Sequence, residues 1–350
     1  MRFLFVSKRG ASLSLAKKIA GEGHKVNFFI NNLNYKLLGE GIVDRGKISD
    51  FSNYDIVIFD EMGLGEYASK MSKVNKLILG SSNFADLFNK DIEYKTKVLS
   101  KCNLRLDNSS GEVIYTTGAY TGFDFIRPFY SYFKKTKFME NDLSTETESM
   151  GCLLFYHKTN KIIKETLYKL RNELKKIGYK GHITFKCSVT ENDLFINDVH
   201  FGFEYDSFYA SLEGLRQPLG EFLYGMAVGS IKRAKVSPDW LCSVRLTIPP
   251  YPFETSDKYN TSTTIGGICN ENLNHLWLRD VYLENGVYKT AGCDGYILSV
   301  SARGLTPNKG FRRCYRTIDN LQIKDKQFRR DILTGLEDRY DKIKIWGWFN

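Results

Sequence analysis

The chain has 350 residues, 42% of them hydrophobic and 14% aromatic, which is enough for two or three domains with buried cores. No apolar run approaches the roughly 18 residues of a membrane span, and the opening MRFLFVSKRGASL lacks the longer apolar segment of a signal peptide. We therefore expect a globular protein of the cytoplasm that makes no contact with a membrane.

The net charge of +10 leaves two interpretations open, because clustered lysines and arginines can neutralise phosphates. The densest basic group is interleaved with Asp319, Asp325 and Asp331. It indicates either a solvated helical face or a contact with a polyanion or a phosphoribosyl group, so nucleic acid stays a candidate partner. The group consists of Arg312, Arg313, Arg316, Lys324, Lys326, Arg329 and Arg330.

The cysteines and histidines predict no metal site. The seven cysteines are odd in number, scattered and never in a Cys-x-x-Cys pair, which indicates neither a disulfide framework nor a zinc site. Most lie in apolar, strand-like runs and are expected to be reduced thiols in the core. None of the five histidines is in a His-x-His or His-Glu-x-x-His arrangement.

The first 88 residues alternate apolar runs with segments of helix length. The strand candidates are MRFLFVS, VNFFI, YDIVIFD (54–60) and NKLILG (75–80). This order predicts a parallel α/β domain over residues 1–88. Gly10, after the first run, could place backbone amides at a helix start, where anions bind, or could serve only the turn.

Residues 139–215 carry the most informative pattern. Two strand-like runs, 151–156 and 183–189, flank a helix predicted over KIIKETLYKLRNELKKIG, whose apolar residues recur every three or four positions. Gly178 and Gly181 are expected to end this helix. A further strand, a loop reading FGFEYDSF and a helix from Asp206 to Leu215 follow.

The carboxy-terminal third is expected to be mainly antiparallel β structure. A helix over residues 221–231 precedes the strand in VSPDWLCSVRLT, which Pro249 and Pro250 end. Short apolar runs then alternate with turns, of which Asn285-Gly286 is a strong hairpin signal. A helix over FRRCYRTIDNLQI comes next. The final Trp346, Trp348 and Phe349 form either a buried anchor or a contact with a partner.

The order loop, strand, helix, strand, turn, strand and loop resembles the catalytic half of ATP-grasp ligases, and more narrowly the phosphoribosylamine-glycine ligases. That family carries Asn-Thr-Gly-Gly-Met-Gly where residues 146–151 read ETESMG, and Glu-Phe-Asn-Val-Arg-Phe-Gly-Asp where residues 196–203 read INDVHFGF. The runs HLWLRDV, SARG and YRTIDNLQI extend the likeness through the carboxy-terminal part.

The resemblance implies a fold of α/β and α+β parts. An amino-terminal parallel α/β (pre-ATP-grasp) domain would span residues 1–88, a truncated ATP-grasp core residues 89–235, and a carboxy-terminal domain of antiparallel strands plus a helix residues 236–350. It also implies ATP and Mg²⁺ as cofactors. No residue is assigned as catalytic. Matched by motif, Asp198 would be the metal ligand, and the cofactor-binding residues would be Thr147, Met150, Gly151, Lys186, Phe201 and Gly202.

Three departures from the family argue against that chemistry. Only LRLDNSSG separates a helix over 92–102 from the strand that begins near Gly111, so the lid subdomain that covers the phosphates in the family has no room. The family's magnesium ligands are replaced by Ile196, which offers no oxygen, and by Asp198. Glu146 and Glu148 make the substrate loop acidic, which would repel a phosphate.

Three functions stay open. The first is a catalytically inactive descendant of the ligase that acts in binding or assembly, with a nucleotide, a sugar phosphate, a second copy or another protein as its partner. The second is a divergent ATP-dependent carboxylate-amine ligase whose lid comes from another chain. The third is a nucleic-acid-associated protein that uses its basic surface. The abundance of Lys, Asn and Ile would also suit a viral genome.

Overall fold

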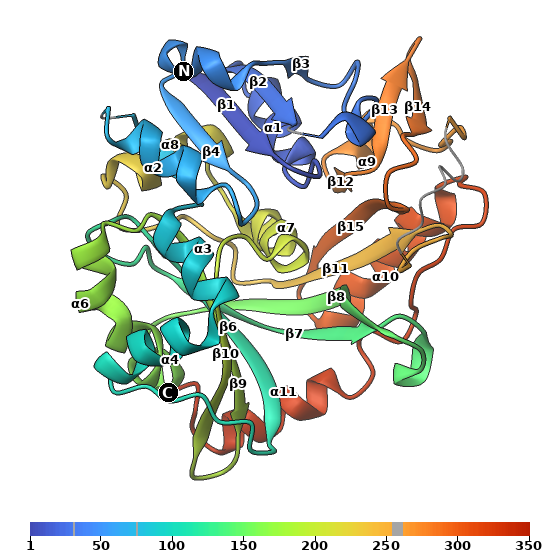
Figure 1. The fold of residues 1–350 in the computed structure, drawn as a ribbon. Coiled ribbons are helices and arrows are strands. Elements are labelled where there is room, and N and C mark those ends of the chain that lie inside the picture. The colour runs from blue at the N-terminus through green and yellow to red at the C-terminus, as the bar shows by residue number, and fades with distance from the viewer. Residues whose placement is uncertain (31, 75, 254–261) are drawn as a thin grey trace.

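The structure is a computed structural model that describes residues 1–30, 32–74, 76–253 and 262–350. It contains two main sheets, and helix α7 (Tyr205–Gly214) lies between them (Figure 1). Among the helices of the described ranges, none combines the length and the apolar character that a membrane crossing requires.

The amino-terminal sheet is parallel and has the order β3-β2-β1-β4-β5, as predicted for an α/β unit. The chain reverses direction across the sheet between β1 and β4, which are neighbours. In open α/β sheets, ligands bind at the carboxyl ends of the strands that flank such a point. The strands are β1 (Arg2–Ser7), β2 (Lys25–Ile30), β3 (Asp44–Arg45), β4 (Ile56–Phe59) and β5 (Ile78–Leu79), with helices α1 (Leu13–Gly21), α2 (Gly65–Ser72) and α3 (Asn83–Lys90).

The second sheet is antiparallel throughout and has eight strands in the order β10-β9-β6-β7-β8-β11-β15-β12. Its β8–β11 pair joins the segments before and after residue 235, so one sheet runs through both, while the division into domains at this residue stays a prediction. The strands are β6 (Glu112–Tyr120), β7 (Phe129–Lys137), β8 (Glu146–His157), β9 (Gly181–Val189), β10 (Leu194–Phe201), β11 (Trp240–Thr247), β12 (Leu276–Leu278) and β15 (Tyr296–Gly304).

The helix predicted after β8 is divided into two, α5 (Lys161–Glu165) and α6 (Leu167–Ile177). Thr166 separates them with φ −123° and ψ −91°, and its hydroxyl donates to the Ile162 carbonyl oxygen at 2.6 Å. Gly178 ends α6 in the left-handed conformation, as predicted. The other helices are α4 (Ile92–Lys101), α8 (Leu219–Val228), α9 (Asn270–Leu273), α10 (Pro307–Asn320) and α11 (Leu336–Ile345), with 3-10 helices at Leu33–Tyr35, Ile48–Asn53 and Glu140–Asp142.

The hairpin predicted at Asn285-Gly286 is confirmed. Strands β13 (Val281–Glu284) and β14 (Val287–Thr290) pair with Glu284 opposite Val287, so two residues make the turn. Both turn residues have positive φ, 51° at Asn285 and 78° at Gly286. Such a turn matches the twist of the two strands, which is why Asn-Gly is favoured here.

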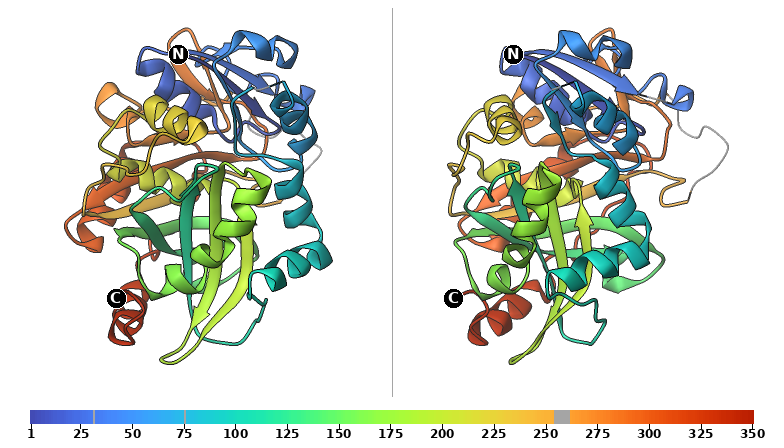
Figure 2. Two further views of the ribbon diagram at one scale, coloured as in Figure 1. Left: turned by 90° about the vertical axis from the view of Figure 1, so that its left-hand side faces the viewer. Right: turned by 60° about the vertical axis from the view of Figure 1, so that its left-hand side comes forward.

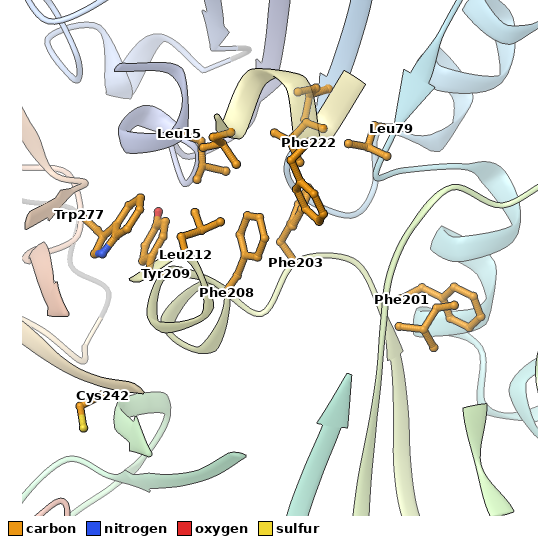
Figure 3. Packing of buried hydrophobic residues seen from close by; sticks show 14 of the residues in the cluster. Leu15, Leu79, Phe201, Phe203, Phe208, Tyr209, Leu212, Phe222, Cys242 and Trp277 are labelled. Carbon is orange, nitrogen blue, oxygen red and sulfur yellow. The ribbon is translucent and has the colours of Figure 1, made fainter. Parts of the chain in front are cut away.

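Aromatic side chains of α7 and the loop before it join the two sheets (Figure 3). Tyr209 stacks on Trp277 with ring centroids 4.7 Å apart, and its hydroxyl donates to the Ala11 carbonyl oxygen. Phe203 and Phe208 lie against each other with centroids 4.8 Å apart. The same helix therefore fixes the amino-terminal sheet, the large sheet and the carboxy-terminal strands relative to one another.

The carboxy-terminal aromatic residues act as a buried anchor. Trp348 is 2% exposed, and its indole Nε1 donates to the Thr190 carbonyl oxygen at 2.7 Å. Phe349 meets Phe155 edge to face with centroids 5.2 Å apart. One of the two predicted roles, the anchor, is thus confirmed for Trp348.

The prediction of a solvated helical face is wrong for Arg329. Helix α10 ends at Asn320, and the Arg329 side chain is 1% exposed. Its guanidinium donates to Asp331 at 2.7 Å, to Asp142 at 2.9 Å and to the Lys137 carbonyl oxygen at 2.8 Å. Asp331, two residues along the chain, and Asp142, 187 residues away, compensate the buried charge. Sequence spacing could not reveal the second of these contacts.

Candidate functional site

A cavity of about 500 Å³ lies where the β1–α1 loop, the end of β4, the start of α7 and the large sheet meet. A smaller hollow of about 330 Å³ adjoins it and shares Lys134, Glu148, His200 and Glu204 with it. We call the two together the central cleft. The larger part contains five cationic and five carboxylate side chains: Lys8, Arg9, Lys134, Arg245 and Arg279, and Asp60, Glu61, Glu148, Glu204 and Asp206.

The structure brings four of the seven predicted site residues to this cleft. Gly202 lines the larger part, and Thr147, Lys186 and Asp198 line the smaller part. The other three do not line it. Met150 and Phe201 are fully buried in the core, and a Cβ at Gly151 would lie 2.6 Å from the Ser243 carbonyl oxygen, so this glycine allows β8 and β11 to approach. Roles in cofactor binding stay predictions for all of them.

A lysine forms an ion pair with Asp198, the residue predicted to bind the metal. Asp198 Oδ1 lies 2.7 Å from Lys95 Nζ and also accepts the backbone N–H of Val199 at 2.8 Å. The Lys95 side chain is 9% exposed, and its ammonium lies over the Phe88 ring of α3, 5.5 Å from the ring centroid. The described residues contain no group of three or more His, Cys, Asp or Glu side chains that could share a metal ion. An ammonium beside the remaining carboxylate does not fit the needs of Mg²⁺, which prefers several oxygen ligands.

The connection between α4 and β6 is short (Figure 2). Residues 102–111 run beside β10, where Leu106 forms a bridge with Ile196. The Asp107 N–H donates to the Ile196 carbonyl oxygen at 2.8 Å, and Asn197 Nδ2 donates to the Asp107 carbonyl oxygen at 3.1 Å. This segment therefore extends the sheet edge, and it holds no lid subdomain.

Asp206 and Arg245 form a buried pair at the floor of the cleft, and no motif in the sequence predicted it. The Asp206 carboxylate accepts from Arg245 Nε at 3.0 Å and Nη2 at 2.6 Å, from the Tyr296 hydroxyl at 2.8 Å and from the Ser299 hydroxyl at 2.6 Å. Burial alone would raise the pKa of Asp206, but the Arg245 charge and these hydrogen bonds outweigh it and hold the pKa below its ordinary value. An arginine inside the apolar run LCSVRLT was the available signal.

The β1–α1 loop presents backbone amides that the chain's own carboxylates occupy. Glu61 Oε2 accepts the N–H groups of Lys8 at 2.9 Å and Arg9 at 2.7 Å, and Asp60 Oδ2 accepts the N–H of Ser12 at 2.9 Å. Burial and the neighbouring Glu61 charge raise the pKa of Asp60 to about 7. A Cβ at Gly10 would meet the Leu38 side chain and φ is 79°, so this glycine serves the turn.

Three charged side chains of the central cleft stay accessible to a ligand: Lys8, Lys186 and Glu148. Among the described residues, the ammonium groups of Lys8 and Lys186 have no hydrogen-bond or ion-pair partner. The Glu148 side chain is 70% exposed, and its nearest cation is Arg245 Nη2 at 3.7 Å. By contrast, Lys134 pairs with Glu204 at 3.0 Å, and Arg9 pairs with Glu61. The larger part of the cleft can therefore offer the Lys8 ammonium and the Glu148 carboxylate to the same small molecule, and Lys186 adds a second cation in the smaller part.

Two relatives of this chain among known proteins are both phosphoribosylamine-glycine ligases. No model of a known protein family matches the chain. The phosphoribosylamine-glycine ligase of Clostridium acetobutylicum is 34% identical over 91 residues, which are 26% of this chain and 20% of that protein. The ligase of the same name from Fusobacterium nucleatum is 23% identical over 231 residues, 61% of this chain and 52% of that protein. The chain thus matches about half or less of the length of these relatives.

Solved structures agree on the fold. The phosphoribosylamine-glycine ligase of Thermotoga maritima aligns with a TM-score of 0.68 at 15% identity and covers 95% of this chain and 100% of that one. The phosphoribosylglycinamide synthetase of Anaerococcus prevotii gives 0.61 at 12% identity over 92% and 98%, and the biotin carboxylase of Campylobacter jejuni 0.62 at 12% over 98% and 96%. Sequence and fold therefore confirm the resemblance: this chain is similar to phosphoribosylamine-glycine ligases and has an ATP-grasp fold.

Proposed function

We propose that this protein binds a small molecule in the central cleft and does not perform ATP-dependent ligation. The relatives act, by their name, on phosphoribosylamine and glycine. Each of these molecules carries an amino group together with a phosphate or a carboxylate. A cleft that presents the Lys8 ammonium and the Glu148 carboxylate suits ligands of this class, because each charge of the ligand meets an opposite charge.

The observation that carries the proposal is the ion pair between Asp198 and Lys95. Ligation through an acyl phosphate needs cations that stabilise charge on the transferred group, and a metal ion usually provides them. Here the only oxygen ligand that the resemblance leaves at the metal position is bound to an ammonium at 2.7 Å. The short connection over residues 102–111 supports the same proposal, because the site loses its cover against water.

Titration calorimetry tests the proposal with glycine, ribose 5-phosphate and ATP as probes, each with and without Mg²⁺. We expect heat of binding from glycine or ribose 5-phosphate that does not depend on Mg²⁺, and no ADP when ATP and glycine are incubated together. Magnesium-dependent ATP binding with ADP release would overturn the proposal. It would instead support the divergent ligase with a lid from another chain, in which Asp198→Ala should abolish ADP release.

Two variants locate the ligand. Glycine carries both an ammonium and a carboxylate, so Lys8→Met and Glu148→Gln should each weaken glycine binding by about 10- to 100-fold, as expected for a charge-assisted hydrogen bond. Ribose 5-phosphate has no cationic group, so only Lys8→Met should weaken its binding. Lys47→Met and Glu191→Gln are matched controls, because both residues are exposed and neither lines the cleft. Equal affinities of cleft and control variants would show that the ligand binds elsewhere.

A further inference from the structure

The basic residues on and after α10 fall into two groups when their partners are considered. Arg329 is buried with Asp142 and Asp331, Arg330 pairs with Asp319, and Lys326 donates to the carbonyl oxygens of Ile318 and Leu321 at the end of α10. These contacts show that Arg329, Arg330 and Lys326 have partners within the fold. In the part of the chain that the structure describes, the side chains of Lys309, Arg312 and Arg316 have no such partner.

Four cations form one exposed stripe on α10. Lys309, Arg312, Arg313 and Arg316 are spaced i, i+3, i+4 and i+7, which places them on one face of the helix, and all four are exposed. The opposite face, with Phe311, Cys314 and Ile318, is buried, and α10 packs there against β11 and β15 (Figure 1). We call these four residues the α10 stripe. At about 1.5 Å per residue, the stripe is about 10 Å long.

The stripe is unfavourable for the helix itself. Like charges at i and i+4, as at Arg312 and Arg316, destabilise a helix by about 0.2–0.5 kcal/mol per pair. Lys309 is in the first turn, where the helix dipole disfavours a cation, and this turn contains no acidic residue. Arg313 donates to the Arg303 carbonyl oxygen at 2.7 Å. Arg303 Nη1 is itself buried and finds no hydrogen-bond partner among the described residues. Stability of the chain therefore does not account for this arrangement.

We propose that the α10 stripe binds the phosphodiester backbone of a duplex nucleic acid, independently of base sequence and of the ligand in the central cleft. Three of its four members are arginines, whose planar guanidinium matches a phosphate with two hydrogen bonds. A phosphate near the start of α10 would also meet the positive end of the helix dipole. Tyr315, between Arg312 and Arg316 in the sequence, is half-buried against the rings of Phe311 and Phe328 and is not free to stack on unpaired bases, so duplex is favoured over single strands.

Fluorescence anisotropy of a short labelled DNA duplex tests the proposal on the full chain. With four phosphate contacts, a plot of the logarithm of the affinity against the logarithm of the salt concentration should have a slope of about −3.6. The affinity should therefore fall about 150-fold between roughly 50 and 200 mM salt. The variant Lys309→Gln/Arg312→Gln/Arg316→Gln keeps one contact and should show a slope of about −0.9, or about 3.5-fold over the same range. Glutamine is a good helix former, so the fold should persist, which circular dichroism checks.

The control removes the same net charge elsewhere. Lys97, Lys101 and Lys175 are exposed on α4 and α6, and their replacement by glutamine should leave the slope near −3.6. If the triple stripe variant does not fold, Arg316→Gln alone should bring the slope to about −2.7. Equal slopes for stripe and control variants, no duplex binding at low salt, or binding of heparin without binding of duplex would each overturn the proposal.

Discussion

Replacing Asp206 by asparagine removes one charge of the buried pair at the floor of the central cleft and keeps the shape of the side chain. Both Asp206 and Arg245 have side chains that are 4% exposed, so the arginine would stay buried with only Glu148, at 3.7 Å, as a carboxylate partner. Breaking such a pair costs about 3–5 kcal/mol. With an unfolding entropy of about 2.1 cal/mol/K per residue, or about 0.7 kcal/mol/K for this chain, a loss of about 4 kcal/mol lowers the Tm by about 5 °C.

Differential scanning calorimetry measures this shift, with Asp341→Asn as the matched control. Asp341 is exposed on α11, and its change should stay within about 0.5 kcal/mol. Because the pKa of Asp206 is lowered in the folded state, its contribution is present above the unfolded pKa of about 3.9 and is lost as pH falls through the folded pKa. The difference between wild type and variant should therefore shrink in acid.

A double variant separates lost charge compensation from lost packing. Asp206→Leu with Arg245→Met removes both charges, and Tyr296 and Ser299 still have each other as hydrogen-bond partners at 2.6 Å. This variant should recover most of the stability that Asp206→Asn loses. If Asp206→Asn unfolds at the same temperature as Asp341→Asn, the pair does not stabilise the site as argued.

Two further predictions concern the anchor and a buried histidine. Trp348→Ala should lower the free energy of unfolding by about 3–5 kcal/mol in a thermal melt, because the ring is 2% exposed. Trp346 is half-buried, so Trp346→Ala should lower it less. Equal losses in the two variants would contradict the anchor role of Trp348. Burial lowers the pKa of His182 to about 3, so its contribution is complete above the unfolded pKa of about 6.5 and is lost as pH falls from there toward 3. In urea unfolding, the free energy of unfolding contributed by His182 should fall by about 1.4 kcal/mol per pH unit from pH 6 to 4, and His182→Leu should lack this contribution. If the free energy of unfolding of His182→Leu depends on pH as steeply as that of the wild type, the histidine is not the source of the loss.

Local signals in the sequence predicted much of the fold. The Asn285-Gly286 turn, the left-handed Gly178 and the alternation of strands and helices before residue 88 all depend on neighbours along the chain. Periodicity alone missed the break at Thr166, because apolar spacing continues across it. It also placed the start of α10 too late, although Thr306 caps the helix and Pro307 follows.

The site was harder to predict, because its charges are compensated across long stretches of sequence. Lys95 and Asp198 are 103 residues apart, and Asp206 and Arg245 are 39 apart. The motif comparison predicted four residues that line the cleft, Asp198, Lys186, Thr147 and Gly202. Lys8 and Glu61 come from segments without a recognised motif, and Arg279 comes from the HLWLRDV run, to which no site role was assigned. Which side chains meet there depends on how α7 holds the two sheets together.

The pairing of β8 with β11 joins the strands of the carboxy-terminal third to the rest of the large sheet. A chain cut between them would leave the edge of β8 with bare N–H and C=O groups along Gly151 to Leu154, a template for self-association. Gene fusion or exchange at that point would therefore have to supply a replacement strand, which constrains how this scaffold could have been shortened or recombined.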